Sequence, residues 1–336
     1  MTTVTDPFAR AAEALAGAPT VALACHVNPD ADALGSMLGL SIHLRALGTQ
    51  TVCSFPNDPF EPPRWASMLP GTDALVPPSS FPNDPAVMVT CDVASLDRLG
   101  SLGGPAVRAT TLIWIDHHVT NEGLGTIPII DPSASSTCEL VWRLLKVLGG
   151  EIQVETAMCL YAGLVTDTGR FQYEAVRPDT LRLAAELREF PFDHTRLVQA
   201  LYEDHGVAYL GLLGIVLERV RVEPDADLVW TYLTRADLDE ADLEPGDADD
   251  LIDLVRTARE ADVAAVVKQQ RDGRFKVSLR SRGGHDVAAA AARFGGGGHR
   301  LASGYTSSQG LVATVEALKN TLGAEPRPGL RPPSRR

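Results

Sequence analysis

Four short apolar runs, separated by helical stretches, restrict the folds open to the first half of this chain. The runs cover residues 21–25, 51–55, 87–91 and 111–115. Strands that are apolar throughout and alternate with helices are typical of a parallel sheet covered on both faces. The sequence therefore predicts an α/β fold whose N-terminal part is a doubly wound, mainly parallel sheet.

The pattern changes near residue 220. Strand-like segments at 225–233 and 264–279 flank an acidic, helix-prone stretch at 237–253, and an alanine-rich helix follows over 286–294. We expect a smaller α/β domain with a mixed sheet here. The predicted divisions are a first domain at 1–190, a helical linker at 191–220, a second domain at 221–325 and a disordered tail at 326–336 rich in proline and arginine.

Side chains that commonly bind metal ions follow three of the four apolar runs, and one more follows a predicted helix at 154–165. They are His26, Asp30 and Asp32 after the first run, Asp92 after the third, Asp116, His117 and His118 after the fourth, and Asp167 after the helix. In open parallel sheets, ligands bind beyond the carboxyl ends of the strands. We therefore expect these distant clusters to converge at one edge.

The candidate metal ligands are His26, Asp30, Asp32, Asp92, His117 and Asp167. Carboxylates with a minority of imidazoles and no thiolate suit a hard to borderline divalent ion such as Mn²⁺. Such a set exceeds the three or four ligands of a single catalytic zinc and fits two ions with one bridging carboxylate. Two such ions favour in-line attack at phosphorus. Taken singly, each aspartate has a plain alternative as a helix cap or turn residue.

Two further segments suit anions. Between 268 and 304, basic residues outnumber acidic ones, although the whole chain carries a net charge of −13. The glycine run at 295–298 can expose backbone N–H groups that cradle an anion, with a flexible linker as the alternative. Ser135 and Ser136 lie at a predicted helix start, where anion binding and plain N-capping are both open.

The acidic charge argues against a protein that coats long duplex nucleic acid or an anionic membrane. No apolar run reaches the roughly 18 residues that span a bilayer, and the first ten residues lack the pattern of a secretory signal. Five scattered cysteines fit reduced thiols. We therefore expect a cytoplasmic protein.

In this order, the motifs resemble those of the DHH phosphoesterase family. The resemblance rests on His26-Val-Asn-Pro-Asp30-Ala-Asp32, Asp92, Asp116-His117-His118, Gly163-Leu-Val-Thr-Asp167, and the glycine run with His299, Arg300, Ser303 and Gly304. The last motif is similar to that of the DHH-associated C-terminal domain. Together they cover about residues 18–322.

The resemblance implies roles for individual residues. His26, Asp30 and Asp92 would hold one Mn²⁺, and Asp32, Asp92, His117 and Asp167 a second, with Mg²⁺ or Co²⁺ as substitutes. His118 would contact the scissile phosphate, and Asp92 and Asp116 belong to the same catalytic group. The resemblance implies that Arg280, Arg282, His299 and Arg300 contact the substrate. The two anion-binding segments add Ser135, Ser136, Gly297, Gly298 and Ser303 as candidate substrate contacts.

Within the family, the chain is similar to the stand-alone nano-RNase group. Those enzymes degrade short RNA and dephosphorylate 3′-phosphoadenosine 5′-phosphate (pAp), and some act on pApA or cyclic di-AMP. The implied partners are therefore short oligoribonucleotides or dinucleotides and pAp, without long duplex nucleic acid or membrane, and a homodimer is favoured. A family II inorganic pyrophosphatase and a non-catalytic nucleotide-binding sensor stay open as alternatives.

Overall fold

The computed structural model describes residues 6–121 and 123–323, which fall into two compact units, one up to Asp204 and one from His205 onward. Helices occupy both sides of this division, within the predicted linker at 191–220. The predicted tail at 326–336 lies outside the described residues. Within the described ranges, none of the helices combines the length and apolar character needed to cross a membrane.

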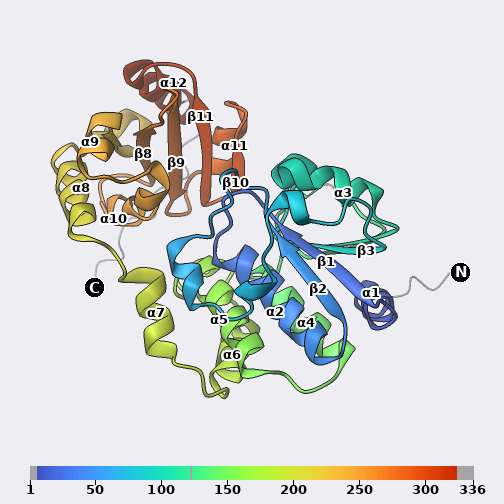
Figure 1. The fold of residues 1–336 in the computed structure, drawn as a ribbon. Helices are drawn as coiled ribbons and strands as arrows, with labels where there is room; N and C mark the ends of the chain where they lie inside the picture. Colours follow the sequence, from blue (N-terminus) through green and yellow to red (C-terminus); the bar gives the residue numbers. More distant parts are fainter. Residues whose placement is uncertain (1–5, 122, 324–336) are drawn as a thin grey trace, which may run out of the picture. The chain divides into compact units, whose positions relative to one another are not determined.

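A sheet of five parallel strands forms the centre of the first unit (Figure 1), in the order β2-β1-β3-β4-β5. The strands are β1 (Thr20–Cys25), β2 (Gln50–Ser54), β3 (Val87–Cys91), β4 (Thr111–Asp116) and β5 (Ile127–Ile130). The predicted α/β class and parallel sheet are confirmed. The edge strand β5 was not predicted, because it is short and contains Pro128, which is tolerated mainly at sheet edges.

Helices cover both faces of this sheet. The helices of the unit are α1 (Pro7–Ala16), α2 (Ala31–Ala46), α3 (Gly103–Arg108), α4 (Thr137–Leu148), α5 (Val154–Asp167), α6 (Pro178–Arg188) and α7 (His194–Tyr202). Val21, Leu23 and Cys25 of β1 belong to a core shared with α1, α2, α4 and α5. The alternate residues Ala22 and Ala24 face the opposite core, which includes side chains of α3. Burial on both faces explains why these strands are apolar throughout.

Two glycines bring α2 and α5 together beside the carboxyl edge of the sheet. A Cβ atom at Gly35 would collide with the carbonyl oxygen of Cys159, and one at Gly163 would lie 2.7 Å from the Cα of Asp32. No side chain larger than hydrogen fits such contacts. The close packing of these helices therefore sets the position of Asp32.

The second unit contains a mixed six-stranded sheet in the order β10-β11-β9-β8-β7-β6, which confirms the predicted architecture. Its strands are β6 (Arg221–Glu223), β7 (Leu228–Leu233), β8 (Val263–Gln269), β9 (Phe275–Ser281), β10 (Gly297–His299) and β11 (Ala302–Ser307). Its helices are α8 (Val207–Glu218), α9 (Arg235–Glu240), α10 (Leu251–Val255), α11 (Val287–Ala292) and α12 (Leu311–Gly323). One face packs on α11 and α12, and the other on α8 and α10.

Two details differ from the prediction. The segment 264–279 is not one strand but the antiparallel pair β8 and β9, because Asp272 and Gly273 form a turn in which Gly273 has a φ of 83°. The glycine run is not wholly a loop, since Gly297 pairs with Gly304 and Gly298 with Ser303 across the β10–β11 hairpin. Backbone pairing with β11 thus stabilises a segment whose composition disfavours regular structure.

We expect Gly163→Ala to lower the free energy of unfolding by about 1–3 kcal/mol, because the new methyl group would overpack the contact with Asp32. Urea unfolding measures this change. Gly17→Ala is the control, since Gly17 has a φ of −86° and its Cβ would meet only the carbonyl of Glu13, at 3.6 Å. Equal stability of the two variants would contradict the expectation.

Candidate active site

Polar side chains occupy the ends of β1, β3 and β4. After β1, Asp30 is the N-cap of α2 and accepts hydrogen bonds from the backbone N–H groups of Asp32 and Ala33. After β3, Asp92 has a φ of 61°, and its N–H donates to the carbonyl of Ile115 at 2.9 Å. Aspartate tolerates this left-handed backbone better than most residues, and such conformations cluster at functional sites.

Asp92 is shared by two groups of possible metal ligands. His26 Nε2 lies 3.4 Å from Asp92 Oδ2 and 3.9 Å from Asp30 Oδ2. His117 Nε2 lies 3.7 Å from Asp92 Oδ1. Each of the sets His26, Asp30, Asp92 and Asp32, Asp92, His117 could hold a metal ion.

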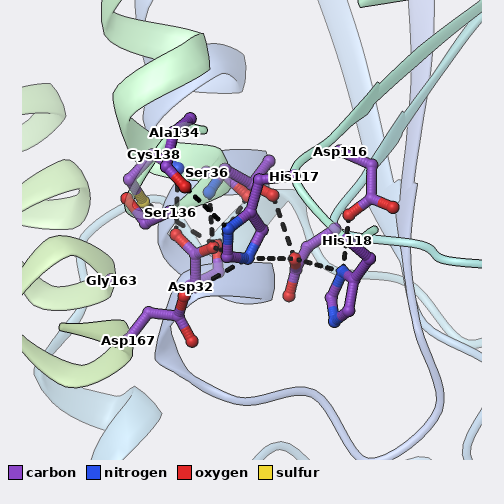
Figure 2. Close-up of polar contacts among 12 residues, drawn as sticks. Asp32, Ser36, Asp116, His117, His118, Ala134, Ser136, Cys138, Gly163 and Asp167 are labelled. Atoms are coloured by element: carbon purple, nitrogen blue, oxygen red, sulfur yellow. Dashed lines mark hydrogen bonds and ion pairs between the residues drawn. The ribbon is translucent and has the colours of Figure 1, made fainter. Parts of the chain in front are cut away.

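His117 also joins the remaining predicted ligands. Its Nε2 lies 3.8 Å from Asp32 Oδ2 and 3.2 Å from Asp167 Oδ2, and the three side chains point toward one another in Figure 2. The structure thus brings together all six side chains named from the sequence. They come from the ends of three strands, the start of α2 and the end of α5.

The two histidines are oriented in the same way. His117 Nδ1 lies 3.2 Å from the carbonyl oxygen of Ala134, and His26 Nδ1 lies 2.9 Å from that of Val27. A main-chain acceptor at Nδ1 is the usual partner of an imidazole that binds metal through Nε2. Because Nε2 of both rings faces carboxylates, the donor set fits divalent cations.

The charges of the cluster support the same fit. Burial raises the pKa of Asp32 well above its ordinary value, aided by the charges of Asp92 and Asp167. Burial also raises the pKa of Asp167, to about 6. Burial alone would lower the pKa of His117, but Asp167 and Asp92 raise it to about 9. The carboxylates thus lie close enough to disfavour one another's negative charge, and bound cations would offset that charge.

Asp92 differs from its neighbours. Burial alone would raise its pKa, but the hydrogen bond to His26 and the charge of His118 hold that pKa well below its ordinary value. The ionised form of Asp92 is therefore favoured. A charged group shared by both sets is suited to bridge two cations.

His118 lies beside the cluster and is held by Asp116. Its Nδ1 lies 2.7 Å from Asp116 Oδ1, and a dashed line in Figure 2 marks this contact. Burial alone would lower the pKa of His118, but this hydrogen bond and the charge of Asp92 raise it to about 10. The amide of Asn121 donates to Asp116 Oδ2 at 2.6 Å and to the carbonyl of Val93 at 3.0 Å.

The predicted anion site at the start of α4 holds an anion of the chain itself. The N–H groups of Thr137 and Cys138 donate to Asp32 Oδ2 and Oδ1 at 2.6 and 2.9 Å, and the Thr137 hydroxyl donates to Asp92 at 2.9 Å. Ser136 is the N-cap of α4, and Ser135 donates to Glu139. Both serines are buried. These contacts correspond to the capping alternative that the sequence left open.

The second unit places its predicted substrate residues around one end of its sheet. The Arg300 guanidinium donates to the carbonyl of Gly283 at 2.9 Å, and Ser281 N–H donates to that of Leu301. Arg282 donates to the carbonyl of Ala258, and Arg280 lies 3.6 Å from Asp253. The Ser303 hydroxyl is buried and donates to the carbonyl of Val287. Cationic groups thus border the β10–β11 hairpin, which contains Gly297, Gly298 and His299.

Two neighbours of the site were not predicted. Asn121 orients Asp116, and the Arg98 guanidinium lies 3.1 Å from His26 Nδ1. Asn121 lies five residues after Asp116, and this spacing alone does not indicate a hydrogen bond between them. Arg98 follows Asp92 by six residues in an irregular helical segment, so only the tertiary fold shows its proximity to His26.

Two family profiles match this chain. The N-terminal domain of the DHH family matches residues 20–164, and the DHHA1 domain matches residues 226–324. The first range contains five of the six clustered side chains, all except Asp167. The second contains the cationic residues and the β10–β11 hairpin.

Several relatives match this chain over most of its length. The chain is 35% identical over 305 residues to the bifunctional oligoribonuclease and PAP phosphatase NrnA of Thermus thermophilus, covering 89% of both chains. It is 29% identical to the protein of the same name from Bacillus subtilis, covering 89% of this chain and 94% of that one. An exopolyphosphatase-related protein from Bacteroides fragilis has a similar structure, with a TM-score of 0.87, 26% identity, and coverage of 96% and 97%.

We expect Mn²⁺ to raise the Tm of the chelator-treated protein, because a ligand that binds only the folded state stabilises it by about 2.7 kcal/mol at 100 times its Kd. Asp92→Asn should remove most of this rise, since Asp92 belongs to both ligand sets. Differential scanning calorimetry measures the effect.

Asp84→Asn is the matched control. Asp84 is exposed and pairs with Arg108 at 2.8 Å, before the start of β3. This variant should keep the full Mn²⁺-dependent rise. The same rise in Asp92→Asn would show that the ions bind elsewhere.

Proposed function

This chain belongs to the DHH family of phosphoesterases, and from that membership we propose that it is a Mn²⁺-dependent hydrolase of short oligoribonucleotides and of pAp. On pApA, and on cyclic di-AMP if it is accepted, the products would be nucleoside 5′-monophosphates. On pAp, the product would be AMP. We also propose that the enzyme acts in the cytoplasm as a homodimer.

The observation that carries this proposal is the convergence on Asp92. Side chains from the ends of β1 and β4 approach its two carboxylate oxygens, in a chain 35% identical to an oligoribonuclease and PAP phosphatase over most of its length. A sensor that had lost catalysis would be expected to lack some of these groups. Here every position carries a competent ligand.

We assign the groups as follows. His26, Asp30 and Asp92 would hold one cation, and Asp32, Asp92, His117 and Asp167 the other. Bound divalent cations at such a site lower the pKa of water and offset negative charge on phosphoryl oxygens.

The remaining polar residues would orient and bind the substrate. Asp116 holds Nδ1 of His118 and so fixes the ring for contact with the scissile phosphate through Nε2. Attack of water on phosphorus breaks the bond to the 3′-oxygen, which leaves with a proton. Arg280, Arg282, His299 and Arg300, with the backbone of Gly297 and Gly298, would bind a further phosphate or the base. Because these residues would bind a single further phosphate or base, they favour substrates of a few nucleotides over long duplexes.

Asp92→Ala should reduce kcat/KM for pApA by more than about 100-fold with Mn²⁺ present, because both sets of ligands lose a member. A steady-state assay of AMP release measures this. Asp84→Asn, as above, should retain the wild-type value. Wild-type turnover by Asp92→Ala would contradict the role of Asp92.

A side-by-side assay of pAp, pApA, cyclic di-AMP and inorganic pyrophosphate separates the candidate functions. We expect turnover of pAp and pApA and little phosphate release from pyrophosphate. Rapid pyrophosphate hydrolysis would favour the pyrophosphatase, and nucleotide binding without turnover of any substrate would favour the sensor.

A further inference from the structure

Glu139, in the first turn of α4, is a buried carboxylate whose partners are Ser135, Arg143 and Arg177. Its Oε2 accepts hydrogen bonds from the N–H and the hydroxyl of Ser135, at 2.9 and 2.7 Å. Its Oε1 pairs with the guanidinium groups of Arg143 and of Arg177, the latter at 3.0 Å. Two cations and two neutral donors thus satisfy one buried anion.

The same two arginines hold the preceding segment, residues 131–136, which links β5 to α4. Arg143 donates to Asp131 Oδ2 at 2.8 Å, and Arg177 donates to the Ser133 hydroxyl at 3.2 Å. Asp131 Oδ1 also accepts from the N–H and hydroxyl of Ser133. The segment is therefore fixed at Asp131, Ser133 and Ser135, all by groups connected to Glu139.

The inner side of this connection, together with the first turn of α4 into which it leads, contacts the candidate metal ligands. The carbonyl of Ala134 faces His117 Nδ1, and Ser135 is the next residue. The N–H groups of Thr137 and Cys138 hold Asp32, and the Thr137 hydroxyl holds Asp92. Ala134, Ser136 and Cys138 lie beside His117 and Asp32 in Figure 2. A shift of the connection would move three ligands at once.

We propose that Glu139, with Arg143 and Arg177, is a positioning residue that sets metal affinity by clamping the β5–α4 connection against Asp32, Asp92 and His117. The proposal rests on the metal site of the proposed function. Groups that orient metal ligands commonly change metal affinity by about 10–100-fold when they are removed. Glu139 does not touch the ligands but holds the segment whose groups orient them. One carboxylate therefore influences Ala134, Thr137 and Cys138 together.

The test uses Glu139→Gln in the full chain. The amide keeps the size of the side chain but loses its charge, and its NH₂ group cannot accept from an arginine. After removal of metal by chelation, isothermal titration calorimetry with MnCl₂ should give a Kd at least about tenfold above that of the wild type. Urea unfolding of the metal-free protein measures structural damage separately.

Glu186→Gln is the matched control. Glu186 of α6 is an exposed carboxylate that pairs, at 3.2 Å, with Lys146 of α4, the helix that contains Glu139. It should bind Mn²⁺ as the wild type does. Should Glu139→Gln fail to fold, Ser135→Ala removes only one hydrogen bond to Glu139 and should still raise the Kd by about two- to fivefold.

The outcomes separate the two claims. If Glu139→Gln, or Ser135→Ala in its place, loses stability but binds Mn²⁺ with the wild-type Kd, Glu139 is merely structural and the inference is overturned. If the wild-type chain itself binds no Mn²⁺, the metal site of the proposed function is wrong. A raised Kd that is restricted to the Glu139 and Ser135 variants supports the inference.

Discussion

The hydrogen bonds from the N-terminus of α4 to Asp32 are the contacts on which the rest of the site depends. A buried carboxylate is costly unless donors surround it. Here the first two N–H groups of α4 and the positive end of its dipole supply that stabilisation. The same turn reaches Asp92 through Thr137, so one helix start holds a member of each candidate ligand set. Gly163 of α5 packs so closely against Asp32 that a Cβ atom there would lie 2.7 Å from the Cα of Asp32.

The second unit uses backbone contacts for a comparable purpose. Asp262 accepts bonds from the N–H groups of Gly284 and His285 and from the hydroxyl of Ser281. These hydrogen bonds hold the turn after β9. In that turn, the Gly283 carbonyl accepts a hydrogen bond from the Arg300 guanidinium. Arg300 of the hairpin thus binds a turn that Asp262 holds by hydrogen bonds. Rigid attachment lowers the entropy that an arginine loses when it binds a phosphate.

Sequence patterns predicted the parallel sheet because a strand buried on both faces must be apolar throughout. They also predicted the clustering of His26, Asp30, Asp32, Asp92 and His117, because polar groups directly after such strands share one edge, whereas Asp167 lies at the end of a helix. The patterns failed to predict secondary structure where backbone hydrogen bonding outweighed the residue composition. The short edge strand β5 contains Pro128, and the glycines of β10 form a strand only because β11 provides backbone partners. The turn at Gly273 divided a segment that otherwise reads as one continuous strand.

By itself, the amino-acid sequence determined the fold class, the edge at which the site lies and the identities of its carboxylates and imidazoles, since all of these follow from hydrophobic burial and strand polarity. Only the tertiary structure decided that the start of α4 holds Asp32, that Ser135 and Ser136 turn inward and that Glu139 joins two arginines to the β5–α4 connection. Those relations depend on distances between segments far apart in the chain, and no local spacing encodes them.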